Sequence, residues 1–497
     1  MDRSVVIARA QGTGVLNPIL YSDLATGEVL NRIFDHLVLT DRAGQHVPGR
    51  LLRGWTRSPD GLTWDFELLP EARWHDGRQV TAHDAVFTFE SILDPEVASA
   101  RRPEFLVRGE PIRFFAVDPG HLRAVLPAPY APFLSALAWR PIIPRHVYAD
   151  GPLRDHPANA APVGSGAFRF AGRSDSELVL RAHTGYHLGR PPLDEVVWRV
   201  VSDQDSALEQ VLTGQADFVP GLSPRLAARA EAAAEVRLVR SLDAGFTYLG
   251  FNTGHPKFAD RRVRRALCHA VDRAALVARV LGGEGQVAHG PFAPGGSWYR
   301  DDLPRFEHDP RLARHLLREA GIGDLAFTIS TVEGDEVKRQ TAELIATQCA
   351  EIGVDVRIEA LPMADLLHTR VRTREFEALV MALVPHPDPA FLHAFYHSSM
   401  LTPVGWNRLA YRDRRVDRLL DAGQTELDVA ARKELVGEAL RTIVADAPQL
   451  FLFHPVVVDA VRDTVVMPEL PETAANRFMY LHQWRLAGSR ADRHQLR

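Results

Sequence analysis

Hydrophobic and polar positions follow two alternating periods in the second half of the chain. A helix is predicted from Asp309, a favoured N-cap residue before Pro310, to Gly321, and a strand follows over 325–331, where every second residue is apolar. Residues 335–351 then carry apolar side chains at helical spacing. The pattern continues with strands at 354–358, 376–384, 451–453 and 456–458 and helices at 363–372, 413–423 and 429–445. Such alternation indicates an α/β layer with crossover connections.

The first half of the chain is less regular. Residues 4–8 are predicted as a first strand, and 49–72 as β-structure around the turn Ser58-Pro59-Asp60-Gly61. The stretch 109–144 combines several prolines with short apolar runs, which indicates a mixed, loop-rich subdomain.

Composition narrows the class of protein. A chain of 497 residues is expected to split into domains, and 46% hydrophobic with 24% charged residues is typical of soluble globular proteins. A formal charge of −5 gives no case for a nucleic-acid partner. No stretch approaches the ~20 apolar residues that span a bilayer. The N-terminus lacks a signal-peptide pattern, so either the protein is cytoplasmic or the sequence begins at a mature N-terminus behind an added Met.

Two cysteines exclude a disulfide framework and a cysteine-rich metal site. Cys268 and Cys349 each lie in an apolar helical pattern, so we predict two buried free thiols. A single disulfide between them is the alternative.

Catalytic motifs are missing from the sequence. There is no G-x-x-x-x-G-K-[ST] phosphate loop, no H-E-x-x-H zinc helix and no G-x-S-x-G elbow. His393 and His397 have the spacing at which two imidazoles on a helix share a metal, but no third ligand or second pair stands nearby in the sequence. We therefore predict a solvated or capping role for these histidines, no metal, no cofactor and no enzymatic activity.

Several segments resemble one known family. Trp74-His75-Asp76-Gly77 precedes 80–87, where Thr81 is expected to cap a helix with Asp84 at its third position. Further matching segments are 162–168, 249–253, 258–273, 309–321, Asp388-Pro389, Asn407 with Tyr411, 416–420 and Ala447-Pro448. In this order, from about residue 5 to about residue 485, they resemble family 5 of the bacterial extracellular solute-binding proteins, which includes oligopeptide-, dipeptide- and nickel-binding proteins.

The resemblance implies an α/β, two-lobed periplasmic-binding-protein fold of type II, with an extra mixed α/β subdomain inserted in lobe 1. Lobe 1 would consist of residues 1–40, 162–247 and 460–497, the subdomain of 41–161, and lobe 2 of 248–459. The chain would cross between lobes near Tyr248 and near 458–461. The implied function is capture of a peptide or similarly sized solute by hinge closure, for the membrane permease of an ABC importer. A periplasmic or cell-surface monomer is expected.

The family also suggests which residues contact the ligand. Such residues lie on loops at the facing edges of both lobes, where a rigid scaffold carries variable side chains. In lobe 1 the candidates are Asn17, Tyr21, Ser22 and Asp23, and Tyr248 lies at the first crossing. In lobe 2 they are Trp298, Arg370, Arg372, His386, Asp388, Trp406 and Asn407. For each aromatic or arginine, packing surface or a solvated helix face is the alternative interpretation.

One position departs from the family pattern. Peptide-binding members use an aspartate after the strand at 376–384 to bind the ligand's α-amino group, and the alignment puts His386 there. A neutral imidazole offers an ammonium no charge-assisted bond. This favours N-blocked or modified peptides, opines, oligosaccharides or a chelated metal, unless the loop is shifted and Asp388 is the anchor.

Two rival functions belong to other classes. A cytoplasmic ligand-sensing module of the same fold would need a DNA-binding segment, and the strand predicted at 4–8 leaves no room for one before it. A hydrolase is disfavoured because no nucleophile and base are recognisable.

Overall fold

The computed structural model describes residues 3–41, 44–138, 140–385, 388–468 and 477–487. The chain forms two compact units: unit 1 is the described part of Met1–Ser241 and Val457–Arg497, and unit 2 is the described part of Leu242–Val456. The chain therefore passes between units twice, once directly after Ser241 and once directly after Val456. The first passage precedes the predicted one at Tyr248, because that residue lies in a strand that pairs along its length with strands of unit 2.

Unit 1 is built on a mixed sheet. Its strand order is β10, β11, β12, β1 and β13, followed by the C-terminal part of β20. The predicted first strand is confirmed as β1, which pairs in parallel with β12 and β13 and buries Val5, Ile7 and Ala8. The bounds are β1 (Ser4–Arg9), β10 (Phe168–Arg173), β11 (Glu177–Ala182), β12 (Glu195–Val200), β13 (Phe218–Leu222), β14 (Val236–Leu242) and β20 (Gln449–Arg462). Helices α1 (Leu24–Ile33), α5 (Gln204–Leu212) and α6 (Pro224–Glu231) accompany this sheet.

A second, antiparallel sheet in unit 1 is formed within the segment 52–125. Its order is β4 (Leu52–Arg57), β5 (Thr63–Leu68), β9 (His121–Val125) and β8 (Arg113–Asp118), with α2 (Ala82–Leu93) packed on it. The predicted cap of α2 is confirmed: the Thr81 backbone N–H donates to Asp84 Oδ2 at 2.8 Å. One apolar core joins both sheets, since Val5 and Ile7 of β1 belong to the same buried cluster as Trp64 and Phe66 of β5. The division of unit 1 into lobe and subdomain remains a prediction.

The remaining elements of unit 1 are short. They are β2 (Val38–Thr40) paired with β3 (His46–Pro48), β6 (Leu106–Val107) paired with β7 (Glu110–Pro111), β21 (Val465–Val466) paired with β22 (Arg485–Leu486), and the helices α3 (Phe133–Leu137) and α4 (Arg145–Tyr148).

Unit 2 contains the regular α/β alternation that the sequence predicts. Its strands are β15 (Phe246–Phe251), β16 (Gly285–Val287), β17 (Leu325–Val332), β18 (Val354–Leu361), β19 (Ala378–Leu383) and the N-terminal part of β20. Strands β18, β17 and β19 are parallel, whereas β15 pairs antiparallel with both β19 and β20. The helices are α7 (Arg261–Ala270), α8 (Arg273–Val280), α9 (Pro310–Glu319), α10 (Glu336–Ala350), α12 (Phe391–Tyr396), α13 (Arg414–Thr425) and α14 (Val429–Asp446).

Two predicted elements of unit 2 differ in detail. The helix predicted at 363–372 is one turn, α11 (Met363–Asp365), followed by a π-helical segment, Leu366–Val371. The two strands predicted on either side of Pro455 form one strand, β20. Proline has no N–H to donate, but the Pro455 carbonyl accepts a hydrogen bond from the Asp243 N–H at 2.8 Å, so the pairing continues past it.

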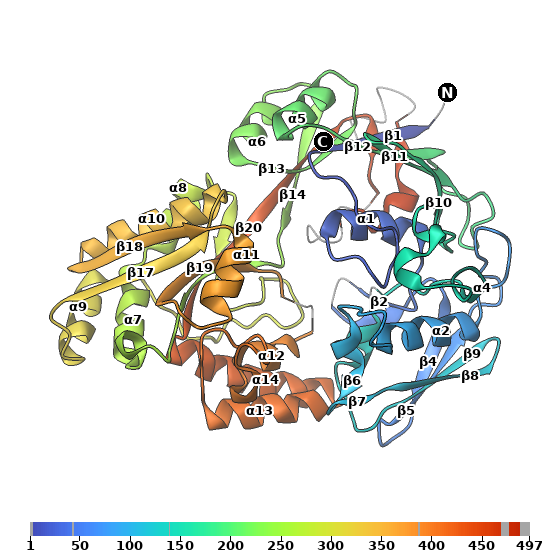
Figure 1. Cartoon of the computed structure of the whole chain (residues 1–497). Coiled ribbons are helices and arrows are strands. Elements are labelled where there is room, and N and C mark those ends of the chain that lie inside the picture. Colours follow the sequence, from blue (N-terminus) through green and yellow to red (C-terminus); the bar gives the residue numbers. More distant parts are fainter. Residues whose placement is uncertain (1–2, 42–43, 139, 386–387, 469–476, 488–497) are drawn as a thin grey trace. The chain divides into compact units, whose positions relative to one another are not determined.

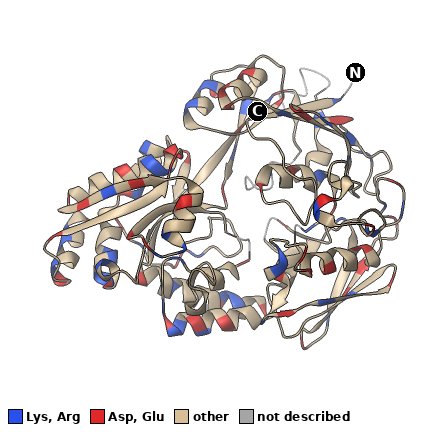
Figure 2. Ribbon diagram, in the orientation of Figure 1, with Lys and Arg blue, Asp and Glu red and all other residues tan. Residues whose placement is uncertain are grey.

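Figure 1 shows α12, α13 and α14 packed beside one another in unit 2, in agreement with the contacts of α13 with both neighbours. Cys268 and Cys349 are buried and free, as predicted, and burial raises the pKa of each thiol to about 12. Figure 2 shows acidic and basic residues interspersed along the helices of both units. Among the described residues, no helix is long and apolar enough to cross a membrane.

Candidate ligand-binding surfaces

The loop that leads into α1 carries the four unit 1 candidates, and two of them are used to hold the loop. Asn17 is fully buried: its amide donates to Asn159 Oδ1 at 2.9 Å, and its side-chain oxygen accepts the Ile19 N–H at 3.0 Å. Asp23 is the N-cap of α1 and accepts both the N–H and the hydroxyl of Thr26, at 2.8 and 2.7 Å. Both side chains therefore position backbone.

The other two unit 1 candidates reach solvent. Tyr21 is half-buried, with the Arg101 guanidinium 5.6 Å from its ring centroid. The ring lies so close to Gly27 of α1 that a Cβ there would be 2.8 Å from Tyr21 Cε2. Ser22 is exposed. The loop thus presents one fixed aromatic ring and one hydroxyl.

In unit 2, Asp388 forms a buried ion pair. Its two carboxylate oxygens accept from the two terminal nitrogens of Arg432 at 2.6 and 2.8 Å, and the side chains are 3% and 7% exposed. Arg432 also donates to the Gly423 carbonyl and lies 5.2 Å from the Trp298 ring centroid. The Asp388 carboxylate is therefore committed to a fixed cation, which argues against the shifted-loop alternative. His386 lies outside the described residues.

Four aromatic rings follow one another at the surface of unit 2. Phe292 and Phe391 have centroids 5.6 Å apart, Phe391 and Phe395 5.9 Å, and Phe395 and Trp406 6.2 Å in a stacked orientation. We call these rings the aromatic row. Trp406 is 59% exposed, and the Arg408 guanidinium lies 5.6 Å from the ring centroids of both Phe395 and Trp406. Because Arg408 is itself buried, at 7% exposure, this arrangement offers a ligand the exposed ring of Trp406.

Asn407 holds the loop that ends the aromatic row. It is fully buried, and its amide donates to the carbonyls of His397 and Tyr411 at 3.1 and 2.8 Å while its oxygen accepts the Tyr411 N–H. Like Asn17, it is a positioning residue, and it fixes the backbone that carries Trp406.

The remaining candidates have different surroundings. Tyr248 is 3% exposed within β15, and Arg370 forms a two-contact pair with Glu359 at 2.7 and 3.1 Å. Trp298 is half-buried between Arg432 and Lys433, and Arg372 is exposed. Solvent therefore reaches Trp298, Arg372 and Trp406 more freely than Tyr248.

Sequence reasoning did not single out Arg432, Phe395 or Arg408. Arg432 could have been found from the sequence. It shares a helical stripe with Val436 and Leu440, and a charged side chain on an apolar stripe requires a buried partner. Phe395 and Arg408 lack such a signal, since their contacts depend on the fold of 397–411.

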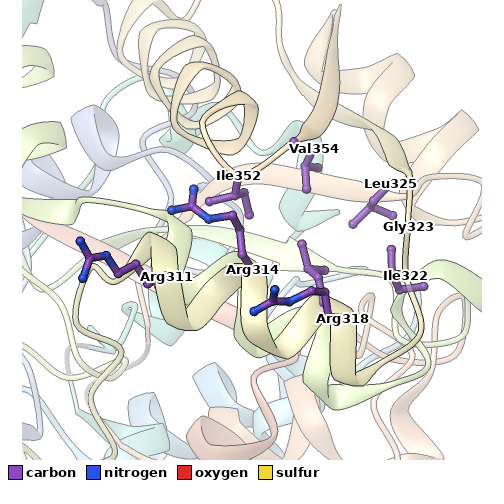
Figure 3. Close-up of a pocket in the computed structure, with 10 residues that line it drawn as sticks. Arg311, Arg314, Arg318, Ile322, Gly323, Leu325, Ile352 and Val354 are labelled. Atoms are coloured by element: carbon purple, nitrogen blue, oxygen red, sulfur yellow. The ribbon is translucent and has the colours of Figure 1, made fainter.

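A separate pocket of about 360 Å³ lies beside α9 and is lined by none of the candidates. Figure 3 shows Arg311, Arg314 and Arg318 along one side of this helix, across from Ile352, Val354 and Leu325. Arg314 donates to the Glu351 carbonyl at 3.0 Å. In unit 1 a second pocket, of about 420 Å³, lies near His146, which contacts Asp76 at 2.6 Å.

Comparison with known proteins identifies the family of the chain. Residues 46–401 match the model of the bacterial extracellular solute-binding proteins, family 5 Middle. The oligopeptide-binding protein AppA of Bacillus subtilis is 27% identical over 469 residues, covering 89% of this chain and 84% of the relative. Protein XP55 of Streptomyces lividans is 30% identical over 467 residues, covering 91% and 83%.

Solved structures share the fold. The ABC transporter substrate-binding protein CtaP of Listeria monocytogenes has a TM-score of 0.90 at 23% identity, over 98% of this chain and 99% of that one. AppA from Bacillus subtilis in complex with a nonapeptide has a TM-score of 0.79 at 24% identity, over 98% and 99%. The fold is that of type II periplasmic binding proteins, as the resemblance implied. The chain belongs to the bacterial extracellular solute-binding proteins of family 5.

Proposed function

We propose that this protein is the solute-binding receptor of an ABC importer and captures a peptide or similarly sized solute without chemical conversion. Family membership supports the class of function, and AppA, a relative over most of the chain, has been solved with a nonapeptide. The observation that carries the ligand class is the aromatic row, which ends in the exposed ring of Trp406 beside Arg408. Exposed, rigidly held aromatics are typical anchors of binding surfaces.

In this proposal the two passages after Ser241 and Val456 act as hinges. The aromatic row of unit 2 is the proposed ligand surface, and the ligand would favour closure about these hinges because it binds the closed form more tightly than the open one. Residues 41–161 would form the subdomain inserted in lobe 1. The expected location is periplasmic or at the cell surface, and the expected partner is a membrane permease.

Mass spectrometry of small molecules released from the purified, denatured protein would identify the ligand class. Calorimetry with that ligand then tests the row: Trp406→Ala should weaken binding tenfold to hundredfold, the range of an aromatic hot spot. Val429→Ala is the matched control, because Val429 is 62% exposed in unit 2 but does not belong to the row. Equal affinity of wild type and Trp406→Ala would contradict the proposal, as would product release in peptide, ester or glycoside panels.

The ligand's N-terminus gives a second test. We propose that His386 occupies the anchor position, and the commitment of Asp388 to Arg432 supports this. Free di- to pentapeptides should then bind poorly, and His386→Asp should improve their binding by about 1.5–3 kcal/mol, with no gain for N-acetylated versions. Tight wild-type binding of free peptides that is lost in Asp388→Asn, with the variant still folded by circular dichroism, would instead identify Asp388 as the anchor. A non-peptide solute, such as an opine, an oligosaccharide or a chelated metal, is the second candidate, favoured by the same commitment of Asp388.

A further inference from the structure

Two pairs of side chains at helical i,i+4 spacing face each other between α12 and α13. His393 and His397 come from α12 and its C-cap, and Asp417 and Asp421 come from α13. The imidazole rings are stacked, with centroids 4.3 Å apart. The two helices are in contact, so the sequence pairs, 24 residues apart along the chain, meet in space.

The distances suit a small ion. Asp421 Oδ1 lies 3.2 Å from His393 Nε2 and 3.5 Å from His397 Nε2, and one ligand atom from each of these three residues lies within 4.8 Å of the others. Metal–ligand bonds of about 2.0–2.1 Å at tetrahedral angles place neighbouring ligand atoms about 3.3 Å apart. Little rearrangement is therefore needed to bring the Asp421 oxygen and both imidazoles onto one ion.

His397 also offers a nitrogen to a metal after a change of tautomer. His397 Nδ1 accepts the Ser399 N–H at 3.1 Å, so in the neutral ring the proton is on Nε2. His397 Nε2 is buried and has no hydrogen-bond partner among the described residues. An ion bound there takes the Nε2 lone pair, so the proton of the neutral ring moves to Nδ1. Nδ1 then donates to Ser399 Oγ, 2.7 Å away, in place of accepting the Ser399 N–H.

The surrounding charge is balanced. Asp417 Oδ1 lies 3.9 Å from His397 Nε2 and accepts the Ser398 N–H at 2.8 Å, so it is a fixed outer carboxylate. With Asp421 it supplies two negative charges for a divalent cation. Asp421 is 63% exposed, which leaves room for water to complete the coordination.

We propose that His393, His397 and Asp421 form a binding site for a divalent transition-metal ion of the zinc class, with Asp417 and Ser399 as outer partners. Imidazole ligands favour zinc, nickel or copper over calcium and magnesium. The proposal does not depend on the identity of the transported solute. Because Phe391 and Phe395 leave α12 on the face opposite to the histidines, an ion here would tie the helix of the aromatic row to α13.

Zinc titration of the untagged, chelator-treated protein tests the site. Calorimetry at pH 7.5 should show one tight ion per chain, which millimolar calcium does not displace. His393→Ala and Asp421→Asn should each weaken zinc binding at least tenfold. The second substitution changes an exposed carboxylate, so folding is retained, and circular dichroism checks this.

The matched control is His315→Ala, which removes an exposed histidine paired with Glu319 at 3.3 Å on α9 but without a second imidazole. It should leave zinc affinity unchanged. A loss below tenfold in His393→Ala or in Asp421→Asn, an equal loss in His315→Ala, or displacement by calcium would overturn the proposal.

Discussion

The loop before α1 in unit 1 and the segment 388–411 in unit 2 carry most of the candidate ligand contacts, and they are fixed in different ways. In unit 1, short polar side chains bond to nearby backbone or to each other, as neutral Asn17 does with Ile19 and Asn159 and as Asp23 does at the start of α1. In unit 2, the buried Asp388–Arg432 pair fixes the start of the segment, and the Asn407 amide with the stacked rings fixes the rest. A neutral polar anchor is inexpensive to bury but limited in strength, whereas a buried ion pair is costly to break. The two regions should therefore respond differently to substitution and to pH.

The largest expected effect is in unit 2. Asp388→Asn leaves the Arg432 guanidinium buried without its carboxylate and should lower the free energy of unfolding by about 3–5 kcal/mol. Urea denaturation followed by tryptophan fluorescence measures this. Glu438→Gln, which breaks the exposed Arg415–Glu438 pair, should cost less than about 1 kcal/mol. Similar losses in both variants would show that the buried Asp388–Arg432 pair is no more costly to break than an exposed pair.

The next largest expected effect is a loss of stability at low pH, caused by His75 of unit 1. Its Nδ1 accepts the Gly164 N–H at 3.2 Å and its Nε2 contacts the Gly166 carbonyl at 3.0 Å, an arrangement that requires the neutral ring. Burial lowers the pKa of His75 from 6.5 to about 4. Between these values the unfolded chain binds a proton that the folded chain does not, so this contribution to stability is lost as pH falls.

The difference in unfolding free energy between pH 7 and pH 5 should be about 2 kcal/mol smaller in His75→Gln than in the wild type. Denaturation curves of both proteins at several pH values test this. Parallel curves would show that the pKa of His75 is the same in the folded and the unfolded chain, because other buried histidines contribute equally to both proteins.

Removal of the neutral anchor Asn17 should have an intermediate effect on the free energy of unfolding. Asn17→Ala removes two hydrogen bonds from a fully buried site and should cost about 1–2 kcal/mol. Ser22→Ala, at an exposed neighbour, should change stability by less than about 0.5 kcal/mol. A loss as large as that of Asp388→Asn would contradict the comparison.

The smallest effect on stability is expected at Trp406. Because the side chain is 59% exposed, Trp406→Ala should shift the free energy of unfolding by no more than about 0.5 kcal/mol while it weakens ligand binding. Thermal unfolding without ligand measures the first quantity. A loss above 2 kcal/mol would mean that the ring holds the segment together and is not reserved for a ligand.

The sequence by itself determined the family, the α/β alternation of unit 2, the Thr81–Asp84 cap and the burial of the two cysteines. These follow from local periodicity and from side chains that act on neighbouring backbone, which a linear pattern records. The sequence also indicates that Arg432 needs a buried partner, since Arg432 lies on the apolar stripe of α14. It does not indicate that this partner is Asp388.

Only the tertiary structure decided which candidates are committed to the fold. The amide of Asn17 meets the distant side chain of Asn159, and the amide of Asn407 meets loop carbonyls. Asp388 is occupied because α14 brings Arg432 to it from 44 residues away. In the same way, the sequence places no further metal ligand near His393 and His397, whereas the packing of α13 on α12 brings Asp417 and Asp421 to them. Spacing describes one helix at a time, whereas a site needs groups from several elements, and their meeting depends on packing that no local pattern encodes.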